Sequence, residues 1–244
     1  MYLVTISPTA HGRAGFPRDE EGRPYLPAAD LREALLAAAF VYATRKDPAF
    51  KTRVKKAVIE EKTDLKRLAH KLEKALLERD PFLADLNLPP RLYLEDGTVK
   101  ERRTLLVNLN KGDVVRDETI EVMEGIIPLP WALPEKEKNH LAAAGRSLAE
   151  ALATMELDRI RDPLPDLVPF YEELKSHKLK KLEWPLRLGY WGEDPFRARL
   201  IAFRRVPEVR DALDRLGYRI EPKRLLYLPK EKQTLGWVYL TEEL

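Results

Sequence analysis

His11 is the residue whose position best suits catalysis, because it follows a strand-like opening segment and lies in a basic loop. A histidine in such a loop could act as a general base on a ribose 2′-hydroxyl group, or it could contact backbone or phosphate without any catalytic role. The other histidines are His70, His140 and His177. They fall in or near charged helical segments, without the spacing that a metal site needs.

The chain lacks the motifs of several common enzyme classes. It contains no G-x-x-x-x-G-K-[ST] or G-x-G-x-x-G phosphate loop and no G-x-S-x-G elbow. It has no cysteine, which excludes disulfides, thiolate metal sites and cysteine nucleophiles. The acidic run Asp19-Glu20-Glu21 could hold a divalent ion, but in an arginine-rich loop such a run is typical of a solvated turn. We therefore expect neither a metal nor a cofactor.

Residues 187–199, RLGYWGEDPFRAR, have the composition of a nucleic-acid contact. Gly189 and Gly192 would let the backbone approach a phosphate group. Tyr190 or Trp191 could stack on a base, and the arginines would neutralise a sugar–phosphate chain. A glycine-bounded turn whose aromatic side chains fill the core would have the same composition.

Charge is unevenly distributed along the chain. The net charge is only +3, but residues 45–79 carry 12 Lys/Arg against 6 Asp/Glu, and residues 187–232 carry 12 against 7. This segregation favours one basic face, although solvated helix faces with scattered ion pairs would give the same counts. The high charged fraction, 34%, is typical of a thermophile or of a GC-rich genome. No stretch is apolar enough to span a membrane, so we expect a cytoplasmic protein.

Periodicity predicts both strands and helices around these residues. Mixed order of this kind is typical of an α+β fold rather than a doubly wound sheet. The predicted strands cover residues 1–7, 91–94, 104–107, 119–123, 218–220, 225–228 and 237–240. The predicted helices cover residues 29–43, 49–59, 63–76, 134–155, 169–176 and 206–216.

Turn and cap residues sharpen this prediction. Thr63 is a suitable N-cap for its helix, and Gly217 is a suitable C-terminal cap for the helix before it. Asp96-Gly97 predicts a hairpin that joins the strands 91–94 and 104–107. The run 110–113, Asn-Lys-Gly-Asp, predicts the next turn.

Four segments together resemble RAMP (repeat-associated mysterious protein) subunits of type III CRISPR effector complexes. Thr5–Gly12 resembles the family's T-x-T-P-x-H-x-G opening, and Gly22–Leu35 resembles its G-x-P-Y-I-P-G-S-S-L-K-G-A-L signature. Arg187–Gly192 stands where the family has a glycine-rich R-L-G-G-G-x-G loop. Pro222–Arg224, followed by Leu235–Val238, resembles the P-K-T-R and L-G-W-V close of the Csm-type cap subunit.

The resemblance implies a ferredoxin-like (RRM-like) core in a single RAMP-type domain, 1–244, with helical insertions at about 46–90 and 134–178. It also implies a non-catalytic structural subunit for antiviral defence, which binds crRNA near its 3′ end and packs against neighbouring RAMP subunits. Its first helix and glycine-rich loop would converge on the RNA. The residues expected to bind RNA are Arg13, Arg18, Arg32, Arg187, Gly189, Tyr190, Trp191, Gly192, Arg197, Arg199, Lys223 and Arg224.

The chain departs from the family pattern at the first helix. The family's Gly-Ser-Ser is Ala28-Ala29-Asp30 here, and its Lys-Gly is Arg32-Glu33, so two carboxylates would repel phosphate. Residues 12–17 contain no carboxylate, whereas target-cleaving subunits carry an aspartate there, so we expect no target cleavage. Two alternatives stay open: a metal-independent crRNA-processing endoribonuclease with His11 as base, and a protein-interaction subunit without RNA contact.

Overall fold

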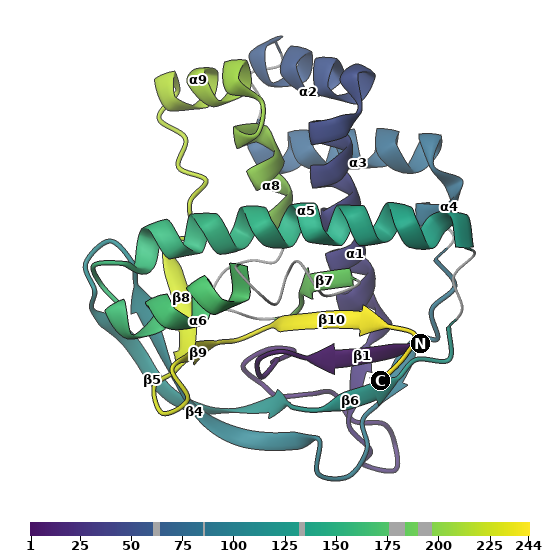
Figure 1. Ribbon diagram of the computed structural model, residues 1–244, viewed down its shortest axis with the longest axis vertical. Helices are drawn as coiled ribbons and strands as arrows, with labels where there is room; N and C mark the ends of the chain where they lie inside the picture. Colours follow the sequence, from purple (N-terminus) through teal and green to yellow (C-terminus); the bar gives the residue numbers. More distant parts are fainter. Residues whose placement is uncertain (61–63, 85, 132–134, 176–183, 190–196) are drawn as a thin grey trace.

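The structure is a computed structural model that describes residues 1–60, 64–84, 86–131, 135–175, 184–189 and 197–244. Within these ranges the chain forms two four-stranded antiparallel sheets and one short pair (Figure 1). The first sheet has the order β6 (Ile126–Pro128), β1 (Tyr2–Thr5), β10 (Trp237–Thr241) and β7 (Trp184–Arg187). The second has the order β5 (Val114–Met123), β4 (Val99–Asn108), β8 (Arg224–Leu228) and β9 (Gln233–Thr234). The pair joins β2 (Tyr25–Pro27) to β3 (Arg91–Tyr93).

Two long helices, α1 (Ala28–Lys46) and α5 (Glu135–Ile160), pack against each other and against β7. Figure 1 shows α5 crossing over the first sheet, with α2, α3 and α9 on its other side. The shorter helices are α2 (Pro48–Glu60), α3 (Leu65–Arg79), α4 (Pro81–Ala84), α6 (Val168–Glu173), α8 (Arg197–Arg204) and α9 (Pro207–Arg215). The α+β class with inserted helices is confirmed, and the first sheet alternates in strand direction as a ferredoxin-like core does.

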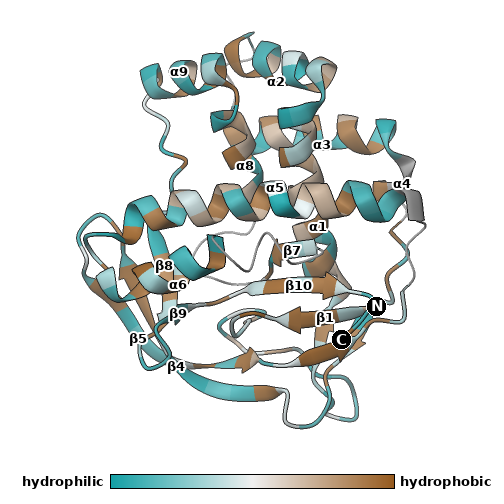
Figure 2. Ribbon diagram, in the orientation of Figure 1, coloured by the Kyte–Doolittle hydropathy of each residue, from teal (hydrophilic) through white to brown (hydrophobic). Residues whose placement is uncertain are grey.

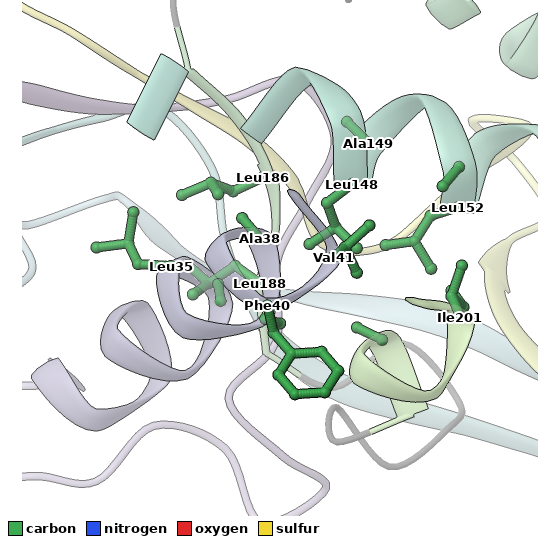
Figure 3. Packing of buried hydrophobic residues seen from close by; sticks show 14 of the residues in the cluster. Leu35, Ala38, Phe40, Val41, Leu148, Ala149, Leu152, Leu186, Leu188 and Ile201 are labelled. Carbon is green, nitrogen blue, oxygen red and sulfur yellow. The ribbon is translucent and has the colours of Figure 1, made fainter. Parts of the chain in front are cut away.

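α1 is the central helix of the core, because hydrophobic residues occupy all of its sides. Residues 34–41 form an unbroken buried run, which a helix shows only when neighbours surround it. Figure 3 shows this run beside Leu148 and Leu152 of α5 and Ile201 of α8. Figure 2 shows the contrast with α9, whose residues are mostly hydrophilic. α1 is therefore the element on which the other helices are assembled.

Several helix signals are confirmed. α1 ends at Lys46, just before Asp47-Pro48, and the predicted hydrophobic stripe of α3 is buried from Leu65 to Leu76. α9 ends in a Schellman motif: Gly217 has φ +72°, and the Tyr218 N–H donates to the Leu213 carbonyl at 3.0 Å. The helices α2, α3 and α4 lie in the segment 46–90, while the single-domain division stays a prediction.

The predicted cap of α3 is wrong. Asp64, not Thr63, is the N-cap, and its carboxylate accepts the Arg67 N–H at 3.0 Å. Thr63 itself lies outside the described residues. Aspartate is an equally good N-cap, so the local signal was off by one residue.

The hairpin predicted through Asp96-Gly97 is also wrong. β3 pairs with β2, and β4 pairs with β5 across the turn at 110–113. The β2–β3 pair is held by side chains distant in sequence, since the Tyr25 and Tyr93 rings meet edge-on at 6.2 Å. Residues 218–220 form no strand, and α8, which periodicity did not predict, replaces part of the expected loop. No helix in the described ranges is long and apolar enough to cross a membrane.

Gly145 allows α5 to approach β7 closely. A Cβ atom at this position would lie 2.8 Å from the Pro185 carbonyl oxygen, which is main chain and cannot rotate away. Gly145→Ala normally stabilises a helix by about 1 kcal/mol, but here we expect a net loss of about 1–2 kcal/mol through overpacking.

Urea unfolding followed by circular dichroism measures this change. Asn139→Ala, at an exposed position of the same helix, is the control and should change the free energy of unfolding by less than about 0.5 kcal/mol. A Gly145→Ala protein more stable than wild type would show that the two elements are not in close contact.

Candidate nucleic-acid interface

The loop after β1 is fastened to the first turn of α1 by a short hydrogen bond. His11 Nδ1 lies 2.6 Å from Asp30 Oδ2. Burial raises the pKa of the Asp30 carboxyl group, and the hydrogen bond with His11 opposes that rise. One third of the His11 side chain, 33%, remains exposed. The histidine therefore has one nitrogen engaged with the helix and an accessible ring.

Two glycines bring three distant segments together, backbone against backbone. Gly189, with φ +69°, lies so close to Ala10 that a Cβ atom would be 2.1 Å from the Ala10 carbonyl oxygen. The Gly236 N–H donates to the Pro8 carbonyl, and the Leu188 N–H donates to the Gly236 carbonyl, both at 2.8 Å. No other residue type fits at either glycine. We call this place the loop junction and define it as residues 8–13 and 188–189, together with residues 28–32, which the His11–Asp30 hydrogen bond attaches.

Arg187, expected to bind RNA, instead lies in the core, with 1% of its side chain exposed. Its guanidinium is 3.4 Å from the Glu156 carboxylate and 4.5 Å from the centre of the Trp237 ring. Glu156 also accepts the Tyr171 hydroxyl at 2.6 Å, and burial raises the pKa of Tyr171 well above its usual value. The expectation for Arg187 is wrong, because a buried cation with these partners cannot reach an RNA chain.

Arg199 is likewise internal. Its side chain, also 1% exposed, forms ion pairs with Glu33 of α1 and Glu73 of α3. Although burial opposes the charge, these hydrogen bonds raise the pKa of Arg199. Arg199 therefore cannot bind RNA as expected, but it neutralises Glu33. It also brings α8 against α1.

Arg13 and Arg18 hold the loop on the edge strand β5. Arg13 Nη2 lies 3.0 Å from Glu118 Oε2, and Arg18 Nη2 lies 2.6 Å from Glu121 Oε1. Both arginines stay about half exposed, at 55% and 44% of their side chains. Ion pairs with this exposure contribute little stability, so each guanidinium remains accessible to a phosphate.

The other predicted residues are scattered. Arg32 donates to the Ala84 carbonyl, which directs its guanidinium toward α4. Lys223 and Arg224 are exposed at the start of β8. Arg197 begins α8. The remaining three predictions lie outside the described residues: Tyr190, Trp191 and Gly192.

Strand register adds a cation that the sequence did not suggest. Arg116 of β5 lies opposite Leu106, which lies opposite Leu226, and both leucines are buried together with Ala10. Directly opposite residues share a face, so Arg116 lies on the face covered by the loop after β1. Arg224, two residues from Leu226, shares that face.

We call Arg13, Arg116 and Arg224 the cationic row. Glu118 lies 3.0 Å from Arg13 and 3.4 Å from Arg116, so one carboxylate serves two cations and the row keeps a positive balance. Arg116 was missed because it stands among acidic residues in the chain. Arg116 is four residues from Ile120 in the same strand, so the alternation of side chains would have placed both on the inner face of the sheet. In the described part of the chain, no three His, Cys, Asp or Glu side chains gather as a metal site requires.

No protein-family model matches the chain. Over 248 residues, the whole of both chains, it is 33% identical to a protein of Aquifex aeolicus (strain VF5) that is described as an uncharacterized protein. The chain belongs to the family of that Aquifex protein.

The fold is similar to that of a chain in the cryo-EM structure of a Csm–crRNA–target RNA ternary complex of a type III-A CRISPR-Cas system. The TM-score is 0.52 at 16% identity, over 97% of this chain and 78% of that chain. Csm5 of T. onnurineus aligns with a TM-score of 0.44 at 16% identity, over 91% of this chain and 72% of that chain. Only the first likeness bears on the fold, and it confirms at that level the resemblance to Csm-type RAMP subunits.

Arg187→Met would leave the Glu156 carboxylate buried without its cation. We expect a loss of about 3–5 kcal/mol in the free energy of unfolding, measured by urea denaturation. The double variant Arg187→Met/Glu156→Leu removes both charges and should recover most of that loss. An unchanged unfolding midpoint for the single variant would contradict the inferred role of the pair.

Proposed function

We propose that this protein is a non-catalytic, guide-RNA-binding structural subunit of a type III CRISPR interference complex, near the 3′ end of the crRNA. The observation that carries the proposal is the loop junction beside the cationic row. Three segments expected from the family pattern to contact RNA meet there, next to arginines of the adjoining sheet that keep part of their side chains exposed. The similar fold of a chain in a Csm–crRNA–target RNA complex supports the assignment.

The first turn of α1 suits a phosphate despite its acidic residues. No side chain caps this helix end: the Ala28 N–H donates to the Pro90 carbonyl at 3.2 Å, and the first turn as a whole carries the partial positive charge of a helix N-terminus. Asp30 is bonded to His11 and Glu33 to Arg199, so each carboxylate already has a partner. These partners therefore largely offset the repulsion of phosphate that was expected from Asp30 and Glu33.

RNA recognition by such a surface depends on phosphates and backbone shape rather than on base identity. Arginines and main-chain N–H groups position a nucleic acid without reading its bases. Placement at the 3′ end rests on the divergent first helix and on the Csm-type cap close of the chain, Leu235–Val238. Neighbouring RAMP subunits would complete this surface.

Arg116→Glu should weaken binding of single-stranded RNA about tenfold at low salt and lower the salt dependence by about one phosphate contact. Fluorescence anisotropy of a labelled RNA, titrated at several salt concentrations, measures both effects. Arg103→Glu is the matched control, because Arg103 lies on the opposite face of the same sheet in an exposed ion pair with Asp117. RNA binding equally strong at low and high salt would rule out the proposal.

The geometry of His11 favours one second candidate, a metal-independent endoribonuclease. A carboxylate bonded to Nδ1 fixes the imidazole so that Nε2 can accept a proton. Under our proposal, repeat RNA incubated with the protein in EDTA stays intact, as gel electrophoresis would show. Cleavage that disappears in His11→Ala would make this protein an enzyme instead.

The protein-interaction alternative requires a different measurement. Crosslinking within an assembled complex should join crRNA to the loop junction or the cationic row. Crosslinks that avoid both would favour a subunit without RNA contact.

A further inference from the structure

A hollow lies at the far end of α1 from the loop junction, where α1 meets α3, α4 and α5. Its volume is about 320 Å³, and its apolar floor includes Leu76 and Leu83. Sixteen residues of α1 separate Asp30 from Lys46, which is roughly 24 Å along the helix. The hollow is therefore separate from the surface proposed for RNA.

Two aromatic rings form one wall of the hollow. Tyr42 of α1 and His140 of α5 are 5.2 Å apart at an interplanar angle of 82°. Both are partly exposed, and among the described residues neither polar ring group has a hydrogen-bond partner. An edge-to-face pair open to solvent presents a π-face on which a third planar ring can stack.

The rim carries both signs of charge. Lys46 and Asp80 line the hollow, and within the ranges that the structure covers neither side chain forms a hydrogen bond or an ion pair. Asp47 is different: it accepts the N–H groups of Ala49 and Phe50 and pairs with Arg79 at 2.7 Å. The Phe50 N–H and Arg79 together lower the pKa of Asp47, so its charge is already satisfied.

We propose that this hollow binds a nucleoside 5′-monophosphate. The base stacks on the Tyr42–His140 wall above the leucine floor. The Asp80 carboxylate accepts hydrogen bonds from the ribose hydroxyl groups, and Lys46 contacts the phosphate. A planar ring, a diol and an anion joined in one molecule match the three kinds of group that converge here. The nucleotide is either free in solution or one unit of an RNA chain.

Isothermal titration of the full-length protein with 5′-AMP, adenosine and inorganic phosphate tests the free nucleotide. We expect 5′-AMP to bind at least about tenfold more tightly than phosphate, because the base contributes by stacking. Tyr42→Ala should weaken 5′-AMP binding about tenfold, while Tyr42→Phe keeps it within about threefold. Lys46→Ala should weaken 5′-AMP but leave adenosine unchanged. Lys51→Ala, an exposed lysine of α2, is the control for loss of charge.

Photocrosslinking with 4-thiouridine RNA tests the other source. Crosslinks to peptides with Tyr42 or His140, without measurable 5′-AMP binding, identify an RNA-borne nucleotide. The proposal is overturned if 5′-AMP does not bind and RNA does not crosslink there, or if Tyr42→Phe and Lys51→Ala weaken binding as much as Tyr42→Ala. The variant Arg116→Glu separates the test of the hollow from the test of the proposed function. It should weaken RNA binding and leave 5′-AMP binding unchanged.

Discussion

The buried ion pair between Arg187 and Glu156 is the interaction on which the candidate site depends. Two charges removed from water are stable only when their geometry is good and further hydrogen bonds surround them. Here the Tyr171 hydroxyl and the Trp237 ring provide that environment, from α6 and β10. The pair therefore joins the end of β7 to α5 and fixes where the chain leaves the first sheet. Gly189 reaches the loop after β1 only because that exit point is fixed.

The loop junction is thus a main-chain structure, held by backbone hydrogen bonds and by the absence of two Cβ atoms. Within it His11 and Asp30 engage each other and Arg32 donates to the Ala84 carbonyl, while Arg13 stays about half exposed. Positive charge for a nucleic acid comes from Arg13 of the junction and from Arg116 and Arg224 of the neighbouring sheet. The main chain thus fixes the position of this surface, and side chains of both the loop and the sheet supply its charge.

Elements whose signal is local could be predicted from the sequence. The strand at Tyr2–Thr5, the breaker-free helix α1 and the Gly217 cap all depend on residues within a few positions of one another. The hairpin predicted over residues 91–107 does not form, because β3 pairs with β2, about 65 residues upstream. Arg187 and Arg199 look like surface cations in the chain, and only their tertiary partners make them internal. Arg116 shows the converse, since its acidic sequence neighbours conceal its place on a basic face.

Ion pairs between segments also change the meaning of the charge distribution. The two basic stretches pack against each other through α2 and α9, where Lys55 of one lies 3.6 Å from Glu208 of the other. Within α2, Lys56 is 4.0 Å from Glu60. Glu60 and Glu208 are already included in the counts, so these pairs leave the net excess unchanged and affect only where it lies, and the counts alone do not make a continuous basic face. Arg13 of the cationic row lies in the loop that His11 joins to the start of α1, and Lys46 lies at the other end of that helix. Because α1 is enclosed by the core along its middle, the two ends are held at a constant separation, and ligands at both would be positioned by the same rigid helix.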